Sequence, residues 1–387
     1  MRRAALIVLD GLGVGGAHDV EQWGDTGSVT IGNVIRANPA LRLPHLEAMG
    51  LGYCGDTGLP GVNAPSAAHG TAQPRSMGKD SITGHWELCG VVLETAFPTF
   101  PHGFPQAVLD EFAARTGRGV LGNVASSGTA ILDQHGAEHV ATGKWIVYTS
   151  ADSVFQVAAH EGIVPIDELH AACVTARHML RGDVGVARVI ARPFVGTPDH
   201  WERTPRRKDF SLAPIGPTLL DHLADAAVPV VGVGKVDDLF ANRGVTSEHT
   251  PTNADAYRLI DNGLRTMTGG LLFANVIEFD QTWGHRNDVP GFVGGLEELD
   301  RWIGGFLTRV GPDDLIIFTA DHGNDPTTPS TDHSRERVPL LIAGPRVRPV
   351  SIGERATFAD VGQTLAEFLG VARLPAGTSF LQEVWAA

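Results

Sequence analysis

Leu315-Ile-Ile-Phe318, followed by Thr319-Ala-Asp-His-Gly-Asn324, is the stretch that decides the fold. Four consecutive apolar residues predict a strand that is buried on both faces, as in a parallel sheet. Asp321 and His322 stand where this strand ends, and open α/β sheets bind their ligands at that end. A carboxylate oxygen beside an imidazole nitrogen suits zinc or manganese rather than calcium. For an isolated pair, a strand-end turn whose Asp caps a helix is an equal alternative.

Two other strands end in the same way, which decides against that alternative. Residues 4–9 and residues 270–277 are each apolar, and each run leads to an Asp. The residues able to bind metal after the three strands are Asp10, Asp280, His285, Asp321, His322 and His333. If the strands are neighbours in one sheet, these side chains can meet at one edge. Three Asp and three His exceed the needs of one ion and predict two divalent cations.

A threonine followed by glycine lies in Gly78-Lys-Asp-Ser-Ile-Thr83-Gly-His-Trp-Glu87. This pattern is typical of a nucleophile on a turn that opens a helix, where backbone N–H groups can hold a phosphate. Taken alone, the motif favours a plainer interpretation in which Thr83 caps the helix and Glu87 lies in its first turn. Beside two metal ions, Thr83 becomes the candidate nucleophile for phosphoryl transfer.

Composition limits the class of protein. A chain of 387 residues favours two domains, and the absence of a long apolar run predicts no membrane span. The net charge of −14 argues against nucleic acid as the main partner. Three widely spaced cysteines (Cys54, Cys89 and Cys173) predict no disulfide framework and a reducing, cytoplasmic setting. The oligomeric state is left open by the sequence.

A second domain is predicted inside the first. Residues 97–105, rich in Pro and Phe, read as a hinge. The block that follows, to about residue 210, alternates strands and helices without an Asp-His signature. It ends in a basic run, residues 203–208, which near a metal site becomes a candidate phosphate-binding segment. We therefore predict an α/β core of residues 1–97 and 212–387 with a mostly parallel sheet, and an inserted α/β domain of residues 98–211.

Over nearly its whole length the sequence resembles the phosphopentomutases of the alkaline phosphatase superfamily, relatives of the cofactor-independent phosphoglycerate mutases. The motifs that carry the resemblance are Val8-Leu-Asp-Gly11, residues 78–87, Gly122-Asn-Val-Ala-Ser-Ser-Gly-Thr129, Tyr148-Thr-Ser-Ala-Asp-Ser-Val-Phe-Gln156, Arg188-Val-Ile-Ala-Arg-Pro-Phe194, Phe279-Asp280 with Gly284-His-Arg286, and residues 319–324 with 331–334.

The resemblance implies a core like that of alkaline phosphatase, binding two metal ions, with the insertion as a cap that binds the sugar phosphate. Thr83 would carry a phosphoryl group. One ion, expected to be manganese, would be held by Asp10, Asp321 and His322, and the other by Asp280, His285 and His333. The substrate contacts implied are Glu87, Ser150, Asp152, Arg188, Arg203, Arg207 and Lys235.

The implied reaction interconverts ribose or deoxyribose 1-phosphate and 5-phosphate through a phosphothreonine and a 1,5-bisphosphate. A sugar bisphosphate such as glucose 1,6-bisphosphate would activate the enzyme. The alternatives are a two-metal phosphatase or sulfatase-like hydrolase, a mutase with another sugar specificity, and a non-catalytic binding module. The last would predict the loss of a ligand or of the nucleophile, and all of them are present in the sequence.

Overall fold

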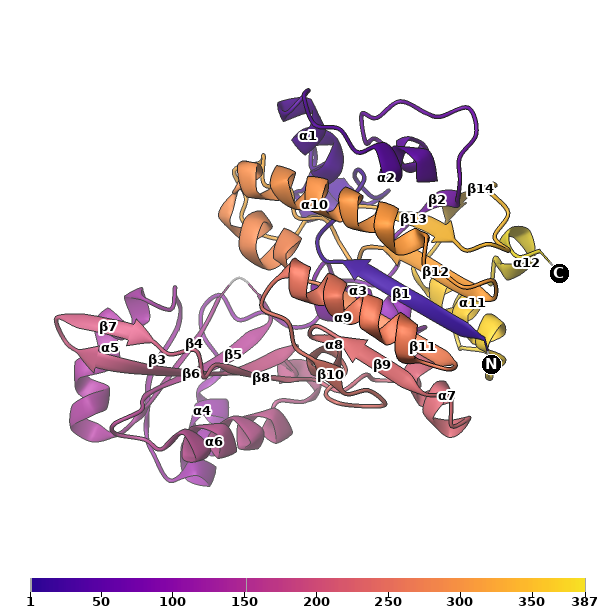
Figure 1. The fold of residues 1–387 in the computed structure, drawn as a ribbon. Helices are drawn as coiled ribbons and strands as arrows, with labels where there is room; N and C mark the ends of the chain where they lie inside the picture. Colours follow the sequence, from indigo (N-terminus) through magenta and orange to yellow (C-terminus); the bar gives the residue numbers. More distant parts are fainter. Residues whose placement is uncertain (1, 151, 387) are drawn as a thin grey trace. The chain divides into compact units, whose positions relative to one another are not determined.

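Two compact units make up the chain in the computed structural model, which describes residues 2–150 and 152–386. Unit 1 spans Met1–Thr95 and Pro214–Ala387, and unit 2 spans Ala96–Ala213. Each unit has its own sheet and its own helices (Figure 1).

Unit 1 is built on an eight-stranded sheet. Its strands, in spatial order, are β10 (Ser247–Glu248), β9 (Val230–Val233), β11 (Gly270–Val276), β1 (Arg3–Leu9), β12 (Asp314–Thr319), β13 (Val338–Ala343), β2 (Ala68–Ala72) and β14 (Ser351–Arg355). The five strands from β10 to β12 are parallel to one another, whereas β13 runs antiparallel to both β12 and β2. β14 is parallel to β2. The prediction of a mostly parallel sheet is confirmed.

β1 lies in the middle of this sheet, and its side chains after Arg3 are buried. Burial on both faces explains why the strand is apolar throughout instead of alternating. The Arg3 guanidinium donates to both carboxylate oxygens of Asp314 at 2.6 and 2.7 Å, and these two residues are register partners. The first residues of β1 and β12 therefore lie side by side at the same end of the sheet. Asp10 and Asp321, each seven residues further along, consequently lie side by side at the opposite end of the sheet.

Helices pack on both faces of the unit 1 sheet (Figure 1). They are α1 (Thr30–Ala37), α2 (Pro44–Met49), α3 (Ser81–Leu88), α7 (Leu219–Asp225), α8 (Val236–Leu239), α9 (Asn253–Thr266), α10 (Val289–Leu307), α11 (Ala359–Leu369) and α12 (Leu381–Val384). α9 packs on β11 and against α10, while α11 packs on β1 and against α3 and α7. Within the described residues, no helix combines the length and apolar character needed to cross a bilayer.

Unit 2 contains a smaller mixed sheet. Its strands are β3 (Val120–Ala125), β4 (Trp145–Thr149), β5 (Val154–His160), β6 (Arg188–Thr197) and β7 (His200–Arg203) in spatial order, with β8 (Lys208–Ser211) also paired to β6. α4 (Gln106–Thr116) and α6 (Ile166–Met179) cover one face over a core that includes Phe112, Trp145 and Phe155. On the other face, α5 (Ala130–Thr142) packs over Ile146 and Phe194.

Candidate metal centre and nucleophile

The three predicted carboxylates meet at the carboxyl ends of three neighbouring strands in unit 1. Asp10 follows β1, Asp280 follows β11 and Asp321 follows β12, and β1 lies between the other two strands. All three side chains are buried. The strand adjacency that the sequence argument required is therefore present in the structure.

One half of the cluster comprises Asp10, Asp321 and His322, whose ligand atoms all lie within 4.8 Å of one another. His322 Nε2 lies 3.3 Å from Asp10 Oδ1 and 3.5 Å from Asp321 Oδ2. The Gly11 N–H donates to Asp321 Oδ1 at 3.2 Å, which fixes that carboxylate. This is the set of three residues that the resemblance assigns to one ion.

The other half of the cluster is centred on Asp280. His333 Nε2 lies 3.2 Å from one oxygen of this carboxylate, and His285 Nε2 lies 3.3 Å from the other. His285 is held on its far side by the Thr331 carbonyl, 2.6 Å from Nδ1. The compact triad around Asp280 is completed by His322, whose ring lies 4.1 Å from that of His333. The two halves therefore form one continuous cluster.

The chemistry of these donors fits divalent cations. Burial and the neighbouring Asp321 raise the pKa of Asp10. Burial would also raise the pKa of Asp280, but His333 holds it well below its usual value. The pKa of His322 stands well above its usual value, because the adjacent carboxylates outweigh its burial. The buried atoms His333 Nε2 and Asp321 Oδ2 make no bond of hydrogen-bond geometry within the described residues, although both have an Asp or His atom within 3.2 Å, as expected of metal ligands.

Thr83 lies in the first turn of α3, which Asp80 caps. Asp80 Oδ1 accepts the N–H groups of Ile82 and Thr83 at 3.0 and 3.1 Å, and Oδ2 accepts the Thr83 hydroxyl at 2.7 Å. The interpretation of Thr83 as the N-cap is therefore wrong, because the Asp80 carboxylate already satisfies these N–H groups. Thr83 lines the same cavity as Asp321 and His322.

Two glycines permit this close packing. A Cβ on Gly78 would lie 2.5 Å from Thr83 Oγ1, and a Cβ on Gly84 would lie 2.2 Å from the backbone oxygen of Asp321. Cβ atoms essentially never come closer than 3.0 Å to another heavy atom, so side chains are excluded at both positions. The turn that carries Thr83 is thereby packed directly on the backbone of a predicted metal ligand.

The cavity wall also carries two cationic side chains that the sequence analysis did not single out. Lys79 Nζ donates to both oxygens of Asp25 at 2.9 and 3.0 Å. Arg335, almost completely buried, donates to both oxygens of Asp19 at 3.0 Å. Lys79 and Arg335 line the cavity together with Thr83. Arg335 also donates to the carbonyls of Pro74, Ser76 and Gly78, so its N–H groups are all engaged and it holds the cavity wall together.

Two residues of α3 contact the predicted ligands and were missed by the sequence analysis. Ser81 Oγ lies 3.1 Å from His322 Nε2. His85 is completely buried, with Nδ1 3.1 Å from Asp321 Oδ2. The signal that could have found them is their four-residue spacing, which puts both on one face of a helix that starts at Ser81.

Two asparagines hold the other carboxylates. Asn275 Nδ2 donates to Asp10 Oδ2 at 2.9 Å, and Asn324 Nδ2 donates to Asp280 Oδ1 at 2.7 Å. Asn275 could have been found as the one amide inside the apolar run of residues 270–277. Such amides fix the orientation of the ligating carboxylates.

Glu87, predicted as a substrate contact, serves another purpose. Its buried carboxylate accepts the N–H groups of Arg75, Ser76 and Phe358 and the hydroxyl of Thr357. Four protein donors engage both oxygens, so Glu87 joins two loops. Glu87 also lines the cavity that holds Thr83, so a substrate contact there stays a prediction beside this structural role.

The remaining predicted substrate contacts fall in both units. Lys235, in unit 1, follows β9 and donates to the side chain of Gln281, the neighbour of Asp280. Those in unit 2 are Ser150, Asp152, Arg188, Arg203 and Arg207. Among them, an oxygen of Asp152 lies 3.5 Å from the Arg188 guanidinium. Ser150 directly follows β4 and Arg203 ends β7.

Comparison with known proteins agrees with this geometry. A family model described as "Metalloenzyme superfamily" matches residues 2–373. A phosphopentomutase from Anaeromyxobacter dehalogenans is 53% identical over 99% of this chain and 98% of its own length. One from Dictyoglomus turgidum is 49% identical over 99% and 98%. The structure of Leishmania mexicana phosphoglycerate mutase superposes with a TM-score of 0.50 at 15% identity, covering 100% of this chain and 98% of that one.

Proposed function

The chain belongs to the phosphopentomutases, and from this premise we propose how its residues interconvert (deoxy)ribose 1-phosphate and (deoxy)ribose 5-phosphate. The observation that carries the proposal is the position of Thr83, which shares a cavity with Asp321 and His322 of the Asp-His cluster. A hydroxyl beside two metal sites is the arrangement that phosphoryl transfer uses. The activity is that of an isomerase acting on small sugar phosphates.

The cluster would hold two divalent cations. The ligands proposed for the first are Asp10, Asp321 and His322, and those for the second are Asp280, His285 and His333. Two such ions, with manganese the expected element, would neutralise the transferring phosphoryl group and lower the pKa of the Thr83 hydroxyl. Asp80 Oδ2 accepts a hydrogen bond from that hydroxyl, with 2.7 Å between the two oxygens, so it is placed to take the proton as Oγ1 attacks phosphorus.

In the proposed cycle, Thr83 stores one phosphoryl group. The bond from Oγ1 to phosphorus breaks as a sugar hydroxyl attacks, which gives the 1,5-bisphosphate. The Thr83 oxygen then attacks the phosphorus at the other end of the sugar and releases the isomeric monophosphate. An enzyme that has lost its phosphoryl group would regain it from a sugar bisphosphate such as glucose 1,6-bisphosphate.

We assign unit 2 to binding of the sugar phosphate. Ser150 and Asp152 would address the ribose hydroxyls, and Arg188, Arg203 and Arg207, with Lys235 of unit 1, would address phosphate. Exclusion of water by such a cap would distinguish a mutase from a phosphatase, because the phosphothreonine must not be hydrolysed before a sugar hydroxyl attacks it. The three cysteines are buried and free, which agrees with a reducing, cytoplasmic setting.

Intact-mass analysis tests this proposal. The purified chain, stripped of phosphate and incubated with metal and glucose 1,6-bisphosphate, should gain one phosphoryl group located at Thr83. The Thr83→Ala variant should gain none. Release of free phosphate from ribose 5-phosphate at a rate comparable to isomerisation would instead identify a two-metal phosphatase.

A further inference from the structure

His85 is completely buried in unit 1, on the helix that carries Thr83. Its ring stacks on that of Phe273 in β11, with 5.9 Å between the ring centroids. Phe273 and Asn275 stand two residues apart on this strand, so their side chains point to the same face of the sheet. His85 therefore packs over the part of β11 that leads to Asp280.

The neighbours of His85 determine which ring nitrogen carries the proton. Nδ1 lies 2.9 Å from the Ser81 carbonyl oxygen and 3.1 Å from Asp321 Oδ2, and both of these atoms are acceptors. Nε2 lies 3.4 Å from Asn275 Nδ2. That amide must present its nitrogen here, because the same nitrogen donates to Asp10 Oδ2 at 2.9 Å. The proton is therefore on Nδ1, and Nε2 accepts from Asn275.

These contacts bridge two carboxylates that come from different strands. Asn275 has two N–H groups, of which one is directed at Asp10 and the other at His85. On the opposite side of its ring, His85 places Nδ1 against Asp321. Asn275 and His85 are both completely buried, so water does not compete for these contacts. Polar groups behind metal ligands act in this way to fix their orientation.

The same imidazole ties these carboxylates to the turn of Thr83. His85 lies two residues after Thr83, and its Nδ1–H donates to the carbonyl of Ser81 at the start of α3. The hydroxyl of Ser81 lies 3.1 Å from His322 Nε2 and 3.4 Å from Asp10 Oδ1. All three ligands proposed for the first ion are therefore linked to the first turns of α3.

We propose that His85, held by Asn275, is the positioning residue that sets the first metal site against Thr83. This role rests on the proposed function, because it takes the ligand set assigned there to the first ion. The bridge orients both carboxylates before an ion binds, so less conformational freedom is lost on binding. Without the imidazole, Asp321 loses its buried polar neighbour and α3 loses its link to both strands. Affinity for the first ion and the rate of phosphoryl transfer should then fall together.

Calorimetric titration of the metal-free, full-length chain with Mn²⁺ tests the effect on affinity. Two binding events are expected, and His285→Ala identifies the second, because His285 belongs to that ligand set alone. His85→Phe keeps an aromatic ring but has no nitrogen, and it should raise the Kd of the first event about 10–100-fold while leaving the second unchanged. Asn275→Leu should weaken the same event. His85→Asn, whose amide nitrogen stands at the position of Nδ1, should recover affinity relative to His85→Phe.

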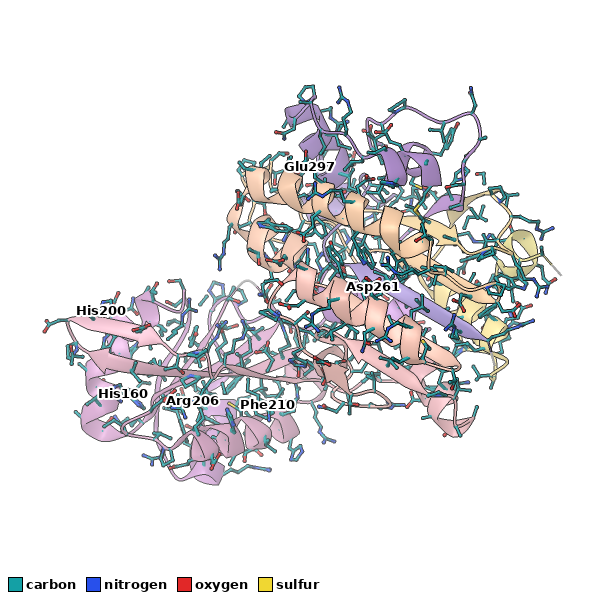
Figure 2. The ribbon with its side chains drawn as sticks, in the orientation of Figure 1. His160, His200, Arg206, Phe210, Asp261 and Glu297 are labelled. Atoms are coloured by element: carbon teal, nitrogen blue, oxygen red, sulfur yellow. The ribbon has the colours of Figure 1, made fainter. Side chains whose placement is uncertain are left out.

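His139 provides the matched control, because it is a second completely buried histidine with its proton on Nδ1. Its Nδ1 lies 2.5 Å from the Lys144 carbonyl oxygen, and its Nε2 accepts the N–H of His160 in unit 2 (Figure 2). His139→Phe removes an equivalent pair of hydrogen bonds, neither of which reaches a proposed metal ligand. It should leave both Mn²⁺ events unchanged.

Turnover at saturating Mn²⁺ tests the link to the nucleophile. Because α3 is free to shift in His85→Phe, kcat for ribose 5-phosphate should fall on the order of 10²-fold even with both sites filled. His85→Asn should restore part of this loss. A normal kcat in metal-saturated His85→Phe would overturn the link between the first metal site and Thr83.

The outcomes separate this inference from the proposed mutase activity. If neither His85→Phe nor Asn275→Leu raises the Kd of the first event more than His139→Phe does, the inference is wrong, whatever the activity. Equal weakening of both events, without recovery in His85→Asn, would show a purely structural role and also overturn it. If circular dichroism shows that His85→Phe does not fold, Asn275→Leu decides. If the first event weakens as expected but the native chain does not isomerise ribose 5-phosphate, the mutase proposal fails and the role in metal binding stands.

Discussion

Replacement of Gly84 by alanine tests whether the Thr83 turn must lie against Asp321. The new Cβ would be 2.2 Å from the backbone oxygen of Asp321, which is 0.8 Å inside the 3.0 Å limit. Because the obstacle is backbone, α3 or the loop after β12 must move by a similar distance. A misplacement of about 1 Å costs on the order of 10²-fold in rate. Overpacking costs about 1–3 kcal/mol, and alanine recovers about 0.5–1 kcal/mol over glycine in a helix.

We therefore expect Gly84→Ala to lower kcat for ribose 5-phosphate on the order of 10²-fold and to reduce the free energy of unfolding by about 0–2.5 kcal/mol. The assays are a coupled isomerisation measurement and a urea titration. The matched control is Gly294→Ala in α10, where a Cβ would meet no atom within 4 Å. That variant should gain about 0.5–1 kcal/mol and keep its rate. If Gly84→Ala behaves like this control, the packing argument is refuted.

Other variants and conditions test separate parts of the site. Thr83→Ala should abolish isomerisation, yet a urea titration should show a free energy of unfolding only about 1 kcal/mol lower, because the variant loses one side-chain hydrogen bond. Retained turnover would exclude Thr83 as the nucleophile. Removal of metal by a chelator should lower Tm, and Mn²⁺ should rebind more tightly as pH rises toward 9. Burial lowers the pKa of His285, but Asp280 more than compensates and brings it to about 9, so the imidazolium must lose a proton before it can bind metal. Calorimetric Mn²⁺ titrations at several pH values check this, and a pH-independent affinity would contradict it. Glu336→Gln should destabilise unit 1 by about 1–3 kcal/mol, because an amide N–H₂ would face the donors of Thr30 or Ser334. Thermal unfolding measures this loss as a lower Tm. An unchanged Tm would show that the buried carboxylate is dispensable.

The convergence of Asp10, Asp280 and Asp321 could be predicted because it follows from a simple rule. Each residue ends an unbroken apolar run, such runs are typical of buried parallel strands, and the carboxyl ends of parallel strands meet at one edge. The mostly parallel sheet follows from the same pattern. The antiparallel strand β13 could not be predicted, because its apolar sequence, Val338–Ala343, is equally suited to either direction.

The supporting residues were less accessible to sequence reasoning, since their roles depend on partners far away in the chain. Glu87 stands near the predicted nucleophile in sequence and so suggested a functional carboxylate, but its donors at Thr357 and Phe358 are known only once the chain has folded.

The central position of β1 has a consequence for biosynthesis. β1 leaves the ribosome early, but its two neighbours begin only at Gly270 and Asp314. The strands of unit 2 lie between residues 120 and 211, so that unit can become compact while β1 still lacks both partners. Until the last third of the chain is made, an apolar segment that ends in a predicted metal ligand stays unpaired. Pairing of β1 with both neighbours then requires the closure of very long loops, which slows the folding of unit 1.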